Sequence, residues 1–150
     1  MQKVTEDEFD LDFKPHAGGF KIRIWLYSCS LEDIPPAGIV VLDVRDLQDG
    51  PENPTRIWRR IDLGLEIVKR HYGVATKCAA GISRSTSIAA AILALREGSD
   101  YRGALEVVKK KCPRAYPNPL ILDSVQSALE IYAGRTKYIP FTDTPVHKHP

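Results

Sequence analysis

The segment between Cys78 and Arg84 has the composition of a loop that binds an oxyanion. The two residues stand six positions apart, and the intervening residues are small except for one isoleucine. A short apolar stretch precedes them and an alanine-rich stretch follows, which predicts a strand, a loop and then a helix. The backbone N–H groups of such a loop and the positive end of the helix dipole attract an anion, and a guanidinium holds two of its oxygens.

The same arrangement predicts the chemistry of the cysteine. A positive field favours the thiolate over the thiol, and a thiolate in line with a bound phosphorus is a nucleophile for phosphoryl transfer. We therefore predict that Cys78 is the nucleophile and that Arg84 binds the phosphate. The predicted substrate-binding residues are Ala79, Ala80, Gly81, Ile82, Ser83 and Arg84. The alternative interpretation is a buried cysteine at a strand end and a surface arginine at a helix start.

A phosphate ester also needs an acid that protonates the leaving oxygen. Three carboxylates lie upstream of the loop, at Asp43, Asp46 and Asp49. Asp43 falls inside an apolar run over residues 39–44, which we expect to form a strand buried on both faces. Asp49 opens the turn-rich sequence Asp-Gly-Pro-Glu-Asn, and an acid on a mobile loop is able to close over a substrate.

The loop resembles the signature of the dual-specificity branch of the protein tyrosine phosphatases. That signature runs His-Cys, two residues, Gly, two residues and Arg-Ser, and here Cys78 to Ser85 reads Cys-Ala-Ala-Gly-Ile-Ser-Arg-Ser. The resemblance implies a protein tyrosine phosphatase-like α/β fold and a phosphoryl-cysteine intermediate, with no metal and no organic cofactor. It also implies that Ser85 supplies a hydroxyl that donates to the cysteine sulfur.

The resemblance favours Asp49 as the general acid. In this family the acid often begins an Asp-x-Pro loop that leads through an asparagine into an amphipathic helix, and Asp49-Gly50-Pro51 followed by Asn53 has that order. Asp46 is the reserve candidate, because its spacing to Cys78 also falls in the usual range. Asn118 resembles a Pro-Asn element that braces the active-site region in many of these enzymes, although an N-cap role explains it equally well.

Lys77 departs from the family pattern, which has histidine before the cysteine. A lysine keeps a positive charge nearby but does not reproduce the hydrogen bonds of an imidazole ring. We therefore expect a less strongly activated Cys78 that is still reactive.

The surrounding pattern predicts an α/β domain with a small, mostly parallel central sheet flanked by helices. The predicted strands are residues 20–27, 39–44 and 74–77, and the predicted helices begin near Pro54, Thr86, Asp100 and Leu120. We expect a flexible N-terminal arm over residues 1–19, a catalytic domain over 20–135 and an extended tail over 136–150. The arginines at 56, 59 and 60 are interpreted as a solvated helix face.

Composition limits the class of partner and compartment. The net charge of the 150 residues is only +2, so we expect no nucleic-acid partner, and no apolar run is long enough to span a membrane. Three cysteines at irregular spacing argue against a disulfide framework and favour the cytoplasm. The predicted function is a protein phosphatase for phosphotyrosine and for phosphoserine or phosphothreonine. The alternatives are a phosphoinositide or RNA 5′ phosphatase, a rhodanese-like sulfurtransferase, and a weakened phosphate-binding module. The oligomeric state is left open.

Overall fold

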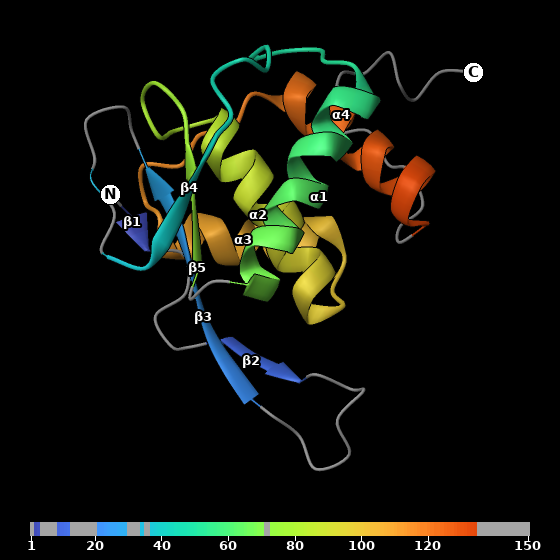
Figure 1. The fold of residues 1–150 in the computed structure, drawn as a ribbon. Coiled ribbons are helices and arrows are strands. Elements are labelled where there is room, and N and C mark those ends of the chain that lie inside the picture. The colour runs from blue at the N-terminus through green and yellow to red at the C-terminus, as the bar shows by residue number, and fades with distance from the viewer. Residues whose placement is uncertain are drawn as a thin grey trace.

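The sheet has a parallel centre with two short antiparallel additions. The computed structural model describes residues 2–3, 9–12, 21–29, 34, 37–70 and 73–134. Strands β3 (Lys21–Cys29), β5 (Gly73–Lys77) and β4 (Ile39–Asp43) run parallel in that order, which confirms the predicted parallel centre. Strands β1 (Gln2–Lys3) and β2 (Phe9–Asp12) pair antiparallel with β3 (Figure 1).

The antiparallel strands correct one expectation about the N-terminal segment. The sequence over residues 1–19 is polar and predicts no regular element, yet β1 and β2 both lie in it. Pairing with the long strand β3 explains them, because a sheet edge supplies backbone partners whatever the side-chain pattern. The predicted tail over residues 136–150 lies outside the described residues, and the domain limits stay a prediction.

Strand β4 lies at the edge of the described sheet, and one of its faces is exposed, which contradicts the expectation that both faces are buried. Leu42 is buried, whereas Val41 is 39% exposed and Asp43 is exposed. The strand that is buried throughout its first four residues is β5, which lies between β3 and β4. An apolar run therefore marked a strand correctly but did not reveal its position in the sheet.

The helices begin where the sequence predicts, within two residues. They are α1 (Pro54–Arg70), α2 (Arg84–Glu97), α3 (Tyr101–Lys111) and α4 (Pro119–Ala128), and α4 continues into a π-helical turn, η1 (Leu129–Ala133). Asn53, Asp100 and Asn118 cap three of them by accepting hydrogen bonds from backbone N–H groups. Gly98 ends α2 with φ 71°, the left-handed conformation that a glycine adopts without strain.

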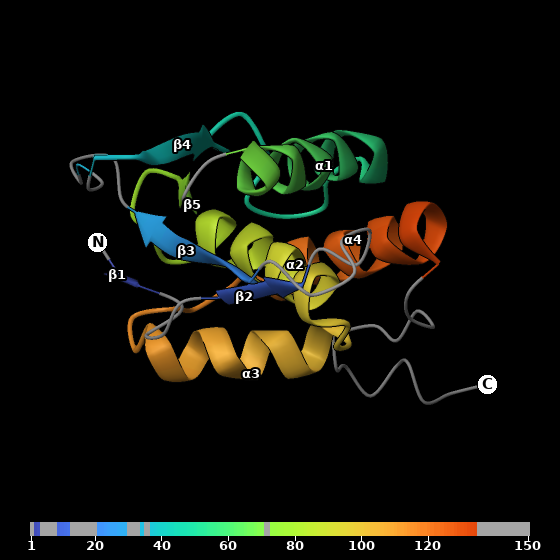
Figure 2. The same cartoon turned by 60° about the horizontal axis from the view of Figure 1, so that its bottom comes forward.

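Helix α2 forms the centre of the core. Its residues from Ser85 to Ala94 are all buried, and it contacts the strands β3 and β5 and the helices α1, α3 and α4, with α1 on one side of it and α3 on the other (Figures 1 and 2). Gly64 allows α1 to approach it closely, because a Cβ at that position would lie 2.5 Å from Cδ1 of Ile92. The rigid packing of α2 fixes its N-terminus, and the loop that enters this N-terminus is the one that carries Cys78.

Candidate active site

The loop after β5 turns its carbonyl groups away from its centre. The carbonyl of Ile82 accepts from Thr86 Oγ1 at 2.7 Å and from the N–H of Tyr116 at 2.9 Å. The carbonyl of Ser83 accepts from Thr86 Oγ1 at 2.9 Å and from Ser87 Oγ at 2.7 Å. Because these outer partners hold the carbonyls, the N–H groups of the loop are left to point inward.

Those N–H groups converge on the sulfur of Cys78. The N–H of Gly81 and the N–H of Ser85 each lie 3.3 Å from Sγ. Gly81 has φ 71°, a left-handed backbone conformation that glycine adopts without strain. Cys78 itself is only 2% exposed and lies at the floor of the loop. The helix dipole of α2, which begins at Arg84, adds positive potential at the same place.

These contacts favour the Cys78 thiolate. Burial alone raises the pKa of the thiol, because it disfavours the charged form. Hydrogen bonds from the side chain of Ser85 and from the N–H groups of Ser85, Gly81 and Ile82 outweigh that effect, and the pKa lies below its ordinary value. The other described free cysteine, Cys112, is fully buried, and burial raises its pKa to about 11. Of these two thiols, only Cys78 has the environment of a nucleophile.

Ser85 should therefore control both the charge and the reactivity of the sulfur. We expect Ser85→Ala to lower kcat roughly ten- to a hundredfold, because a hydrogen bond to a charged group contributes about 1.5–3 kcal/mol. The acidic limb of the rate profile should shift to higher pH, since the substitution removes the strongest contact that lowers the Cys78 pKa. Steady-state kinetics from pH 5 to 9 measure both effects, and an unmoved limb would contradict this role.

Arg84, the first residue of α2, is held by the chain that follows β4. Its Nη1 atom donates to the carbonyl of Arg45 at 2.7 Å and to the carbonyl of Leu47 at 3.1 Å. A guanidinium has five N–H donors. The two on Nη1 donate to these carbonyls, which leaves two donors on Nη2 and one on Nε. Within the described part of the chain these three donors have no protein partner. Together they form a planar edge whose geometry suits two oxygens of an oxyanion.

Asp49, Ser83 and Asn118 form one hydrogen-bonded chain beside the loop. Ser83 Oγ donates to the Asp49 carboxylate at 2.5 Å and accepts from the N–H of Asn118 at 2.8 Å. Asn118 Nδ2 also donates to the Asp49 carbonyl at 2.7 Å, while its side-chain oxygen caps α4. The side chain of Asn118 thus has both roles that the sequence left open. Ser83 therefore joins the carboxylate of Asp49 to the loop over residues 78–84.

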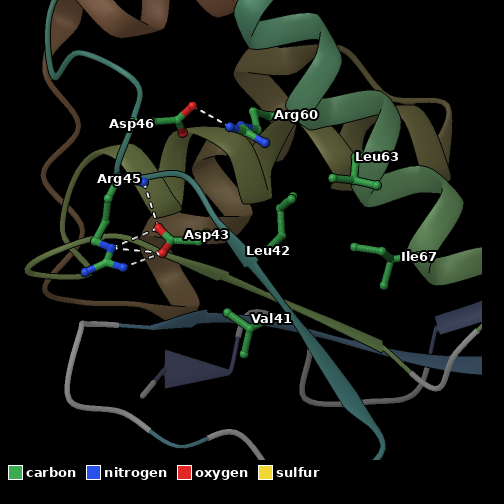
Figure 3. A pocket seen from close by; sticks show the side chains of 8 residues that line it. All are labelled: Val41, Leu42, Asp43, Arg45, Asp46, Arg60, Leu63 and Ile67. Atoms are coloured by element: carbon green, nitrogen blue, oxygen red, sulfur yellow. Dashed lines mark hydrogen bonds and ion pairs between the residues drawn. The ribbon is translucent and has the colours of Figure 1, made fainter.

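Asp46, the reserve acid, lies in a different environment. Its carboxylate pairs with Arg60 (Figure 3) and, at 3.4 Å, with Arg56, and both arginines lie on α1. The hydrogen bond from Arg60 is the main reason that the pKa of Asp46 is lowered. A carboxylate held in its charged form is a poor proton donor, so this contact favours Asp49 as the acid. It also shows that Arg56 and Arg60 are more than a solvated face, a role that no spacing in the sequence indicated.

A pocket of about 600 Å³ lies between β4 and α1. Its floor is apolar, and two acid–arginine pairs, Asp43–Arg45 and Asp46–Arg60, lie around it (Figure 3). The lining residues are Val41, Leu42, Asp43, Arg45, Asp46, Arg60, Leu63 and Ile67. None of its lining residues belongs to the loop over residues 78–84, and one of them, Arg45, binds Arg84 through its carbonyl.

Lys77 ends β5 directly before the nucleophile. In the sheet it pairs with Asp43 on β4 and with Cys29 on β3. Its charge helps to lower the pKa of Asp43, after the stronger contribution of the hydrogen bonds from Arg45. The lysine therefore acts electrostatically on a neighbouring strand. Among the described residues, no group of three or more His, Cys, Asp or Glu side chains could hold a metal ion.

Comparison with known proteins shows a similarity over part of the sequence and a similarity of fold. No family model matches the chain. Dual specificity protein phosphatase 1B of Arabidopsis thaliana is 37% identical over 54 residues, which are 36% of this chain and 32% of that protein. The chain therefore matches about a third of the length of that relative.

Solved structures extend the similarity to the fold. Human DUSP28 superposes with a TM-score of 0.56 at 20% identity, over 66% of this chain and 81% of that chain. A mouse putative dual specificity phosphatase complexed with zinc tungstate has a TM-score of 0.56 at 22% identity, over 65% and 75%. PTPMT1 in complex with PI(5)P has a TM-score of 0.53 at 16% identity, over 65% and 79%.

The fold is the α/β fold of the protein tyrosine phosphatases, as the sequence predicts. Within that class the chain is similar to the dual-specificity branch. In the described part of the chain, no helix is both long and apolar enough to cross a membrane.

Proposed function

We propose that this protein hydrolyses phosphate monoesters on phosphorylated proteins through a phosphoryl-cysteine intermediate. The observation that carries the proposal is the environment of Cys78, whose sulfur accepts hydrogen bonds from two backbone N–H groups at 3.3 Å. Arg84, which follows in the same segment, keeps donors that no described residue uses. A thiolate beneath an oxyanion cradle has one evident use, which is attack on a bound phosphorus.

In the first step the Cys78 thiolate attacks phosphorus, and the bond from phosphorus to the leaving oxygen breaks. Asp49 gives its proton to that oxygen, so that a neutral alcohol or phenol departs. Arg84 and the N–H groups of residues 79–84 stabilise the charge on the three remaining phosphoryl oxygens.

In the second step the Asp49 carboxylate removes a proton from water, and the resulting hydroxyl attacks the phosphoryl-cysteine. The sulfur–phosphorus bond breaks, inorganic phosphate leaves and the thiolate is restored. The Ser85 hydroxyl, which donates to the sulfur, stabilises the departing thiolate. Neither step requires a metal ion or an organic cofactor. A reducing compartment such as the cytoplasm suits the reaction, because a reactive thiolate is readily oxidised.

The test begins with hydrolysis of an aryl phosphate and of phosphotyrosine and phosphothreonine peptides by the full chain. Denaturation during turnover should trap a covalently phosphorylated enzyme, which mass spectrometry locates at Cys78. Turnover without this intermediate, or turnover that survives alkylation of the thiol, would overturn the mechanism. A phosphoinositide, an RNA 5′-phosphate end and thiosulfate are the competing substrates. A higher kcat/KM for one of them than for the peptides would reject a protein substrate.

Replacement of Lys77 by histidine tests how the unusual neighbour affects the nucleophile. We expect Lys77→His to raise activity near neutral pH and to shift the acidic limb of the kcat/KM profile to lower pH. The reason is that an imidazole can orient the loop by fixed hydrogen bonds, which lowers the pKa of Cys78 further. Profiles from pH 4.5 to 8.5 measure both quantities. If neither changes, the lysine is neutral for the reaction.

A further inference from the structure

The chain between β4 and the Asp49 loop is bound by arginines at three successive carbonyl groups. The carbonyls of Arg45 and Leu47 accept from Nη1 of Arg84. The carbonyl between them, on Asp46, accepts from Nη2 of Arg56 at 2.8 Å. Arginines from two helices, α1 and α2, therefore hold one short turn.

Asp46 connects this turn to α1 through its side chain as well. Its carboxylate pairs with Arg60 and Arg56, which project from the first two turns of α1. The neighbouring Leu47 is 2% exposed and anchors the turn in the core. The N–H of Leu47 also donates to the carbonyl of Val44 at 3.2 Å, which closes the turn. The ion pairs of Asp46, the burial of Leu47 and the hydrogen bond that closes the turn thus fix the direction of the carbonyls of Arg45 and Leu47.

We propose that Asp46 is a positioning residue that sets Arg84 in its phosphate-binding orientation. This inference rests on the proposed function, because it assigns Arg84 to the substrate phosphate. Arg84 has a long side chain with many rotamers, and holding it in one of them before substrate arrives removes an entropic cost of binding. The two flanking carbonyls select that rotamer, and the Asp46 contacts with Arg56 and Arg60 keep the carbonyls in place.

The kinetic consequence follows from a population argument. If the turn loosens, Arg84 occupies its binding orientation for a smaller fraction of the time, and apparent affinity falls by that fraction. Once substrate is bound the orientation is restored, so the chemical step is unchanged. Loss of Asp46 should therefore raise KM and leave kcat nearly constant.

The decisive variant is Asp46→Asn, which removes the charge and preserves the size of the side chain. We expect KM for an aryl phosphate to rise roughly three- to tenfold, with kcat within about twofold of the unsubstituted chain. Asp46→Glu should recover most of the affinity, because a carboxylate remains within reach of Arg60. The matched control is Asp62→Asn on the exposed face of α1, which should change neither constant.

Binding of inorganic phosphate separates this inference from the proposed function. Calorimetry on the Cys78→Ser background needs no turnover, and Asp46→Asn should weaken phosphate binding there by the same factor as KM. If no phosphorylated enzyme forms in the unsubstituted chain, the proposed function fails while the phosphate titration still decides the role of Asp46. Unchanged phosphate affinity would overturn the inference.

Two further results of these experiments would also decide the role of Asp46. A large fall in kcat at constant KM would make Asp46 the general acid and reject the positioning role. If Asp46→Asn does not fold, Arg60→Gln removes the same ion pair from the α1 side and should raise KM in the same way. A normal KM in that soluble variant would also reject the proposal.

Discussion

Cys78→Ser is expected to lose at least roughly 10⁴-fold in kcat toward an aryl phosphate and to form no phosphorylated enzyme. A serine hydroxyl at this position is protonated at neutral pH, and no described side chain that contacts Sγ is a base able to remove its proton. Ser85 donates to the sulfur, and the other contacts are backbone N–H groups. The same N–H groups that favour a thiolate give a neutral hydroxyl no activation.

The variant should keep its affinity for oxyanions, because the loop, Arg84 and the α2 N-terminus remain. Loss of turnover together with retained phosphate binding would show that Cys78 acts in chemistry and not in folding. Cys112→Ala is the matched control, since Cys112 is also a buried thiol but is fully enclosed by apolar core. It should keep turnover even if it lowers thermal stability. Normal turnover by Cys78→Ser would reject the mechanism.

Local sequence signals predicted the fold well where the ends of a helix depend on contacts with neighbouring residues in the chain. The caps at Asn53, Asp100 and Asn118 and the glycine at 98 end or begin helices through contacts within four residues. Such contacts depend on neighbours in the chain, so they can be predicted from composition and spacing. The position of β4 at the sheet edge depends on which strands pair, and hydrophobicity alone does not determine strand order.

The same distinction applies to the candidate site. Cys78 and Gly81 lie in one loop and Arg84 begins the helix that follows it, so the predicted order of strand, loop and helix is observed. The link from Ser83 to Asp49 spans 34 positions, and the link from Arg84 to the carbonyl of Arg45 spans 39. Backbone carbonyls carry no side-chain signature, so a contact with them is invisible in a sequence. The different surroundings of Asp46 and Asp49 became visible only when the arginines of α1 were placed in space.

Asp49→Asn is expected to reduce kcat by roughly 10²- to 10⁴-fold when the leaving group is a simple phenol or an alcohol. These groups depart as poor anions and need a proton in the transition state. An amide of the same size cannot supply one, although it can still accept the hydrogen bond from Ser83. The substitution therefore removes the acid while leaving the chain of contacts to Asn118 in place.

The effect should depend strongly on the leaving group, which provides the sharpest test of the role. A nitrophenyl ester leaves readily as its anion, so its cleavage by Asp49→Asn should be slowed far less than that of phenyl phosphate. With that ester, hydrolysis of the phosphoryl-cysteine should become limiting, because the base that activates water is also lost, and phosphorylated enzyme should accumulate. An equal loss for every ester would instead mean that Asp49 acts by holding Ser83 and the loop. In that case Ser83→Ala would reproduce the loss of kcat. Under the acid mechanism, Ser83→Ala still has the acid and should cleave the different esters with the same relative rates as the unsubstituted chain.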